Sequence, residues 1–553
     1  FFLGISPVEA DAVATVLNVL QNGKVSTPSL KEIESYDTVF ILGEDVTNTA
    51  PMIALGLRQT AKTLPKEKAY ALRIQKWNDA AIREVVQDEK GPFFIATPYR
   101  TKLEEIATAS IQGDTAGLVE LAEKITGNIV KNNINDQSTS FDQQVAKALA
   151  KSKKPLIVSG TGMMSNEIIK AAANIAGALK DLGKDVGIVY AVPEVNSMGL
   201  AMIGGSGSIN DAAQRVAAEK DVTAVILETD LFYRTDRKTA SEFLNNCQTT
   251  ILLDVMENET TPEVDFILPS GTFAEADGTV VNNEGRAQRF YQVFMPGNDM
   301  KSSWAWLDMM THQTTVARPF DAIILEMIEN FPAFEGIKTL APSADFRIGT
   351  QKIPRETHRY SGRTAMNANI SVHEPKPPVD VDSPLSFTME GYHGKAPSTD
   401  IPYFWSPGWN SVQSINKYQI EVGGPLHGGN PGKRLIEAKD SGSSRFPVNG
   451  QSVREANFEV LPSWLIYGSG EMSSKSPAVA KRVPEATISI SEKALEKSGL
   501  KRTQKIKINY NTTDIVLPVK VDNSLPENVL LLPYGLKETA GVQFPFHAGI
   551  AGV

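Results

Sequence analysis

The chain has 553 residues and carries 55 Lys and Arg against 64 Asp and Glu, for a formal net charge of −9. This acidic balance argues against a nucleic-acid-binding protein, which needs a basic domain or stripe. The sequence has no apolar run near the ~20 residues of a membrane span, so we expect no direct membrane insertion. A chain of this length predicts about three or four domains.

The one cysteine, Cys247, limits the redox chemistry of the chain. An iron–sulfur cluster needs about four thiolates, or two thiolates and two His, so we expect no cluster within these residues. Cys247 follows a helix-like stretch, where a buried, inert thiol is the usual role. The amino end, FFLGISPVEADAV, has neither an initiator Met nor a signal-peptide pattern, which indicates a piece of a longer cytoplasmic protein.

The first α/β unit is predicted at residues 38–63. An apolar run at 38–43 is typical of a buried strand. In the polar segment that follows, Thr47, Asn48 or Thr49 can cap a helix that has Pro51 in its first turn. A strand, a polar turn and a helix start form a ligand-binding corner in many α/β folds, although most such corners bind nothing.

A Gly-rich turn, GTGMM, follows the predicted strand Lys154–Gly160 and precedes the predicted helix Asn166–Leu182. Such a turn can cradle a phosphate on free backbone N–H groups. The dinucleotide spacing G-x-G-x-x-G fails, however, because Ser165 occupies the third Gly position. We therefore favour a plain tight turn, and a nucleotide-binding α/β protein is a weakened alternative.

The remaining α/β elements alternate along the chain. The pattern predicts strands at 92–97, 185–190, 222–228, 249–254 and 265–268, helices at 103–110, 117–132, 140–151 and 210–218, and a flexible Gly-rich run at 196–207. Alternating strands and helices imply a mostly parallel sheet covered on both faces.

The stretch FAEADGTVVNNEGRAQR, residues 273–289, predicts a short hairpin. Asp277-Gly278 is a strong hairpin dipeptide, and Glu284-Gly285 supplies a second tight point. The stretch holds Glu275, Asp277, Glu284, Arg286 and Arg289. We interpret Asp277, Glu284 and Arg286 as a structural charge cluster, and we assign no catalytic, cofactor-binding or metal-binding residue.

The texture of the sequence changes from about residue 300. Residues 346–462 predict an irregular insertion rich in Pro, Gly and aromatic residues, and loops of this length are usually functional or disordered. Aromatic side chains argue against disorder. Four His, at spacings of 15, 20 and 34, match no metal template: His358, His373, His393 and His427.

The charged hairpin stretch also carries a longer pattern, E-x-D-G-T-x-x-N-x-E-G-R-x-Q, from Glu275 to Gln288. In this pattern the chain resembles the molybdopterin oxidoreductase superfamily. The resemblance implies formate dehydrogenase-type, mostly parallel α/β domains and a C-terminal double-psi β-barrel. The strand, helix, hairpin and final strand predicted within residues 484–553 are similar to that barrel. The implied domains are 1–150, 151–345, 346–462 and 463–553.

Within that superfamily, five stretches resemble the large iron–sulfur subunits of bacterial respiratory NADH:quinone oxidoreductase, complex I. They are LGEDVTNTAP (42–51), NSMGL (196–200), GTVVNNEGRAQR (278–289), HRYSGRTAMNANISVHEP (358–375) and PGWNS (407–411). The match is to the carboxyl two-thirds of that subunit. It implies that the iron–sulfur clusters belong to the missing amino-terminal third and that this segment holds no cofactor.

The resemblance further implies a structural part that supports NADH-to-quinone electron transfer within an enzyme complex, without catalysis of its own. The implied partners are other peripheral-arm subunits, including the NADH-binding subunit, and residues 346–462 are expected to supply docking surface. The implied location is the cytoplasmic side of the bacterial inner membrane. The alternative is an active formate- or nitrate-type molybdopterin oxidoreductase that lacks its amino-terminal cluster domain.

Overall fold

The computed structural model describes residues 1–340, 432–449 and 457–553, apart from 76, 77, 136, 293, 294, 503 and 512. The chain divides into two compact units. The first contains residues 1–270, 280–286 and 434–553, and the second contains 271–279 and 287–433. The four His and most of the predicted insertion at 346–462 lie outside the described residues.

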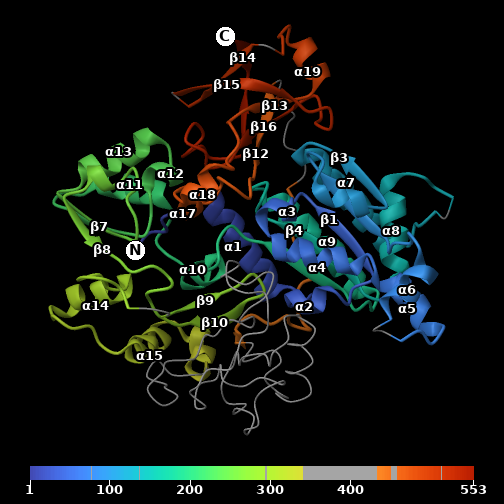
Figure 1. Cartoon of the computed structure of the whole chain (residues 1–553), viewed down its shortest axis with the longest axis horizontal. Helices are drawn as coiled ribbons and strands as arrows, with labels where there is room; N and C mark the ends of the chain where they lie inside the picture. Colours follow the sequence, from blue (N-terminus) through green and yellow to red (C-terminus); the bar gives the residue numbers. More distant parts are fainter. Residues whose placement is uncertain are drawn as a thin grey trace, which may run out of the picture. The chain divides into compact units, whose positions relative to one another are not determined.

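A five-stranded parallel sheet with strand order β3-β2-β1-β4-β5 forms the centre of the first unit (Figure 1). Its strands are β1 (Thr38–Leu42), β2 (Phe93–Thr97), β3 (Ala109–Gln112), β4 (Pro155–Gly160) and β5 (Gly187–Ala191). Every residue of β1, β2, β4 and β5 is buried. Because helices cover both faces of this sheet, its strands read as continuous apolar runs.

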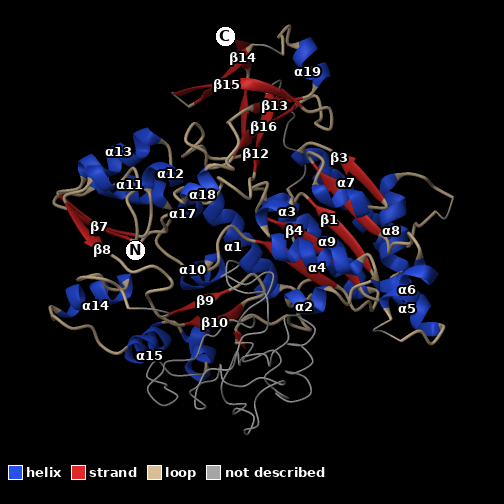
Figure 2. Cartoon of the chain, in the orientation of Figure 1, coloured by secondary structure: helices blue, strands red, loops and turns tan. Residues whose placement is uncertain are grey.

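Helices cover both faces of this sheet (Figure 2). On one face, Ile53 and Leu57 pack into a cluster with Ile41. On the other face, the Phe141 ring lies 6.4 Å from that of Phe40. The helices of this region are α1 (Pro7–Asn22), α2 (Leu30–Ile33), α3 (Val46–Thr49), α4 (Pro51–Thr60), α5 (Thr63–Ala71), α6 (Asp79–Val86), η1 (Lys102–Ile106), α7 (Thr115–Val130), α8 (Phe141–Lys151), α9 (Asn166–Asp181) and α10 (Ser197–Ile203).

The structure corrects three sequence-based predictions in this region. Strand β3 occupies part of the predicted helix at 103–110, and helix α10 forms within the predicted flexible run. The predicted helix cap is wrong, because Asp45 caps α3 by accepting the Thr47 N–H at 3.2 Å and α4 has no side-chain cap. Strands β4 and β5 pair into the same sheet as β1 to β3.

A separate parallel sheet, β6-β7-β8, follows in the chain: β6 (Thr223–Leu227), β7 (Thr249–Asp254) and β8 (Phe266–Pro269). One face packs on an apolar cluster from α11 (Ile209–Ala218), α12 (Leu231–Arg234) and α13 (Arg237–Asn246). The other side exposes Val225, Leu227 and Phe266 at 45%, 44% and 59%. The expectation that both faces are covered is therefore wrong for this sheet.

The carboxyl-terminal sheet has the order β17-β12-β16-β13-β15-β14-β18. Its edge strands β17 and β18 are consecutive in the chain and are separated only by Gly549, so the sheet nearly closes into a barrel. Its elements are β12 (Phe458–Ser463), α17 (Glu471–Ser474), α18 (Pro477–Ala480), β13 (Ile488–Ile490), α19 (Glu492–Lys497), β14 (Lys505–Tyr510), β15 (Thr513–Val521), β16 (Val529–Pro533), β17 (Phe546–Ala548) and β18 (Ile550–Gly552). The predicted strand, helix and hairpin order is confirmed.

The predicted hairpin is formed by β9 (Gly278–Val281) and β10 (Arg286–Phe290), and β10 also pairs with β11 (Lys433–Arg434). Its turn contains Gly285, whose φ of +72° favours glycine. Asp277-Gly278 is not the turn, since Gly278 is the first residue of β9 and a Cβ there would collide with the Phe290 ring. Among the remaining elements, the second unit contains α14 (Ser303–His312), α15 (Phe320–Asn330) and η3 (Pro332–Thr339). The first unit contains η2 (Thr261–Glu263).

Candidate functional site

The strand order of the five-stranded sheet reverses beside β1. The chain adds β2 and β3 on one side of β1 and then β4 and β5 on the other side. In open α/β sheets, ligands bind at such a switch point, outside the carboxyl ends of the strands. Here the turn after β1 carries Glu44, and the GTGMM turn follows β4.

The Glu44 side chain crosses this crevice. The residue is only 1% exposed. Its Oε2 accepts the Gly162 backbone N–H at 2.8 Å, and its Oε1 accepts the Thr49 hydroxyl at 2.7 Å. Burial raises the pKa of Glu44 to about 7, although both hydrogen bonds act to lower it. The group can therefore exchange a proton near neutral pH.

The two glycines of the turn after β4 make room for this carboxylate. A Cβ at Gly162 would lie 2.5 Å from Glu44 Oε1, and one at Gly160 would collide with Oε2. The Gly-rich turn is tight, as the sequence predicts, and it cradles a carboxylate of its own chain. Sequence reasoning missed Glu44, although an acidic residue directly after a buried strand is a signal that could have found it.

A cavity of about 190 Å³ opens beside Glu44. The Trp464 indole donates to the Gly162 carbonyl at 2.8 Å, and its ring stacks on Tyr534 with centroids 4.0 Å apart. These contacts attach the segment after β12 to the turn after β4. The wall is formed by Glu44, Asn48, Thr49, Thr161, Gly162, Ala191 to Pro193, Trp464 to Ile466, Ser469 and Gly470.

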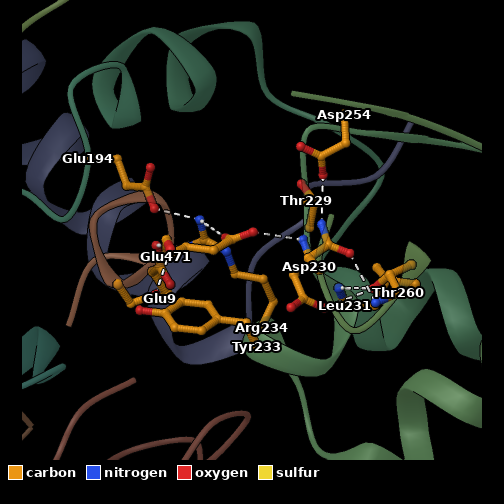
Figure 3. A network of polar contacts seen from close by, with 12 residues as sticks. Glu9, Glu194, Thr229, Asp230, Leu231, Tyr233, Arg234, Asp254, Thr260 and Glu471 are labelled. Carbon is orange, nitrogen blue, oxygen red and sulfur yellow. Dashed lines mark hydrogen bonds and ion pairs between the residues drawn. The ribbon is translucent and has the colours of Figure 1, made fainter. Parts of the chain in front are cut away.

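Glu194 and Glu471 directly follow two lining residues of this cavity in the sequence, Pro193 and Gly470. A buried guanidinium joins these carboxylates from distant segments (Figure 3). Arg234 Nη2 lies 2.5 Å from Glu194 and 3.4 Å from Glu471, and Nη1 lies 4.0 Å from Glu9. Tyr233, its neighbour, donates its hydroxyl to the Ser469 carbonyl at 2.6 Å. The cluster of Glu9, Glu194, Arg234 and Glu471 thus connects α1, the loop after β5, α12 and α17.

This cluster has three acids and one base, and its side chains are mostly buried except that of Glu194, which is half-exposed. Burial raises the pKa of Glu9 and of Glu471 to about 7, and Arg234 opposes both shifts. Burial also disfavours the charged guanidinium, yet the carboxylates of Glu194 and Glu9 hold the pKa of Arg234 above its ordinary value. The sequence gives no local signal of the cluster, because its members come from distant segments and meet only in the fold.

The hairpin charge cluster is partly as predicted. Glu284 pairs with Arg286 Nε at 3.1 Å, and it also pairs with Arg434 at 2.5 Å, a partner that the sequence did not indicate. Asp277 belongs to the second unit, where its carboxylate accepts the Gln292 N–H at 2.8 Å. Including Asp277 in the cluster was therefore wrong.

The other singled-out residues have structural contacts. Arg289 pairs with Asp321 at 2.7 Å, and Glu275 accepts the Thr272 N–H at 3.0 Å. The Cys247 thiol is partly buried and donates to the Phe243 carbonyl at 3.3 Å, and burial raises its pKa. Within the described ranges, no group of three or more His, Cys, Asp or Glu is arranged to hold a metal ion.

Comparison with known proteins places this architecture in a family. The molybdopterin oxidoreductase family model matches residues 6–310, which is more than half of the chain. The chain belongs to the molybdopterin oxidoreductase family. The solved acetylene hydratase from Pelobacter acetylenicus shares its fold, with a TM-score of 0.52 and 11% identity over 96% of this chain and 74% of that one.

Among curated family relatives, the G subunit of the NADH-quinone oxidoreductase of Salmonella typhimurium is 39% identical over 98% of this chain. The corresponding G subunit of Pseudomonas fluorescens is 38% identical over 97% of it. The chain spans 62% of the length of the Salmonella relative and 61% of the Pseudomonas one.

Proposed function

We propose that this chain is a cofactor-free structural part of the G subunit of respiratory NADH-quinone oxidoreductase, complex I. The observation that carries the proposal is identity of 37–39% to proteins of that name over nearly the whole chain. In this role the chain supports NADH-to-quinone electron transfer by the complex and catalyses no step itself. The iron–sulfur clusters would then belong to protein outside these residues, since one cysteine cannot ligate a cluster.

The family name implies a pterin cofactor with phosphate groups, and the crevice residues do not fit such a group. The Glu44 carboxylate already accepts the Gly162 N–H, which a phosphate would need. None of the described residues that line the cavity is Lys, Arg or His. An anionic cofactor would therefore lie beside the acidic Glu44, with no basic side chain among the described lining residues to balance its charge. This supports the cofactor-free proposal.

The proposed partners are the other peripheral-arm subunits, including the NADH-binding subunit, on the cytoplasmic side of the bacterial inner membrane. Within the described part of the chain, no helix is both long and apolar enough to cross a membrane. The names of the relatives, which are subunits of one oxidoreductase, support assembly with further subunits.

Elemental analysis and the ultraviolet–visible spectrum of the purified chain test the proposal. We expect no stoichiometric molybdenum, tungsten or iron, no cluster absorption, and no formate oxidation with a dye acceptor. Stoichiometric metal with formate or nitrate activity would overturn the proposal in favour of an active molybdopterin enzyme. In a second experiment, we expect the tagged chain to capture other complex I subunits in a pull-down. Failure to capture any of them would contradict the proposed assembly.

A further inference from the structure

The cavity beside Glu44 presents an unusual set of polar groups. The hydroxyls of Thr49 and Thr161 donate to Glu44 and to the Ala191 carbonyl. The Ser469 hydroxyl donates to the Tyr534 carbonyl at 2.8 Å. Together with the Trp464 indole, which donates to Gly162, these side-chain donors are already used inside the protein. These four side chains therefore offer a ligand no further donor, and Asn48, the other polar amide of the wall, donates one of its two N–H groups to Asp45.

The charge of the cavity wall determines the sign of the charge that a ligand should carry. Glu44 is the one acidic residue among the described lining residues, and none of them is basic. The Glu44 carboxylate accepts hydrogen bonds from the Thr49 hydroxyl and the Gly162 backbone N–H, and the Asp45 backbone N–H also interacts with it. A carboxylate has about four lone-pair sites in all, so it retains acceptor capacity. An uncompensated buried carboxylate favours a positively charged partner.

The size and the aromatic wall define the ligand further. A cavity of about 190 Å³ is well above the ~10–15 Å³ that one water needs on the same measure, so it admits a group of several heavy atoms. Trp464 lines the same cavity, and Tyr534 covers one face of its indole, so attraction of an ammonium or guanidinium group is confined to the opposite face. We propose that the cavity binds a small organic cation, an ammonium or guanidinium compound, with its N–H donors directed at the Glu44 carboxylate.

The ionisation of Glu44 gives this site a pH dependence. Burial raises the pKa of Glu44 to about 7, so a cation that binds the ionised form has to displace the proton. Asp45 on the same turn interacts electrostatically with Glu44, and so does Tyr99 after β2, whose own pKa is raised by burial. Binding should therefore tighten about tenfold from pH 6 to pH 8 as the fraction of ionised Glu44 rises.

Isothermal calorimetry of the purified chain tests the site, with ethylammonium and methylguanidinium chloride as probes and sodium chloride at equal ionic strength as the salt control. We expect saturable millimolar binding at pH 8 that weakens at least about tenfold in Glu44→Gln, since a hydrogen bond to a charged group is lost. The control is Glu194→Gln, which removes the same charge from a residue outside the cavity wall. This variant should bind like the wild type.

Three results would overturn the proposal. They are the absence of saturable heat with either probe, equal affinity of Glu44→Gln and the wild type, and a heat of sodium chloride addition equal to that of the probes. If Glu44→Gln does not fold, the wild-type chain still decides the question through pH, because an affinity that is equal at pH 6 and pH 8 excludes an ionised Glu44 as the binding group. The result does not depend on assembly into a respiratory complex, so its failure would leave the proposed function intact.

Discussion

The carboxylate of Glu44 accepts the backbone N–H of Gly162 at 2.8 Å and so joins the turn after β1 to the turn after β4. These two turns meet where the strand order of the sheet reverses. A side chain of the protein itself thus occupies the position at which related folds bind a ligand. This contact explains why both glycines of the turn are needed.

Replacement of Gly162 by Ala should destabilise the chain by about 1–3 kcal/mol, because the new Cβ would lie 2.5 Å from Glu44 Oε1. In a Glu44→Ala background the same replacement should cost clearly less, since the clashing group is gone. Urea unfolding of the four chains of this double-mutant cycle measures the coupling. Gly127→Ala is the control: its Cβ meets nothing within 4 Å inside α7, so it should not destabilise. Equal costs in both backgrounds would contradict the contact.

Replacement of Arg234 by Leu should lower the free energy of unfolding by roughly 3–5 kcal/mol. The change leaves the carboxylates of Glu9 and Glu471 buried without their shared cation. Arg237→Ala is the matched control, because its pair with Glu259 is exposed and exposed pairs contribute about 1 kcal/mol or less. Chemical unfolding monitored by circular dichroism gives both values. Similar small losses in the two variants would show that the buried cluster is not stabilising.

Glu9 should make the stability depend on pH. Its folded-state pKa of about 7 lies above its ordinary value of 4.5, so the folded chain retains a proton that the unfolded chain releases. The free energy of unfolding should therefore fall as pH rises from about 4.5 to 7, by at most ~1.4 kcal/mol per pH unit for this group. Glu9→Gln should reduce that slope, whereas Asp11→Asn, an exposed change on the same helix, should not. An unchanged slope in Glu9→Gln would rule out its titration in this window.

Removal of Glu284 should cost more stability than removal of Arg286. Glu284→Ala leaves both Arg286 and Arg434 without the carboxylate they share, whereas Arg286→Ala leaves the pair of Glu284 with Arg434 at 2.5 Å. We expect a loss of up to about 3–5 kcal/mol for Glu284→Ala and a smaller loss for Arg286→Ala. Thermal unfolding of the purified variants checks the order. Unchanged stability together with lost quinone reduction in an assembled complex would instead identify a functional site.

Local patterns in the sequence determined much of the fold. The apolar runs of β1, β2, β4 and β5 predict strands because fully buried strands need apolar side chains on both faces. The helix α4 begins at Pro51, as its pattern predicts, since proline suits a first helical turn. The family resemblance, carried by the residues of the hairpin, is confirmed by the family model over residues 6–310.

Only the tertiary structure decided which groups the buried charges pair with and how burial changes their pKa. Glu44 and Gly162 are 118 residues apart, and Arg234 and Glu471 are 237 apart. The sequence also placed Asp277 with Glu284, whereas the fold pairs Glu284 with Arg434, 150 residues away. Turn and strand signals depend on residues that are close together in the sequence, so they can be recognised without knowledge of the fold. The partner and the ionisation of a buried charge depend on which distant segments exclude water around it, and that is fixed only when the chain has folded.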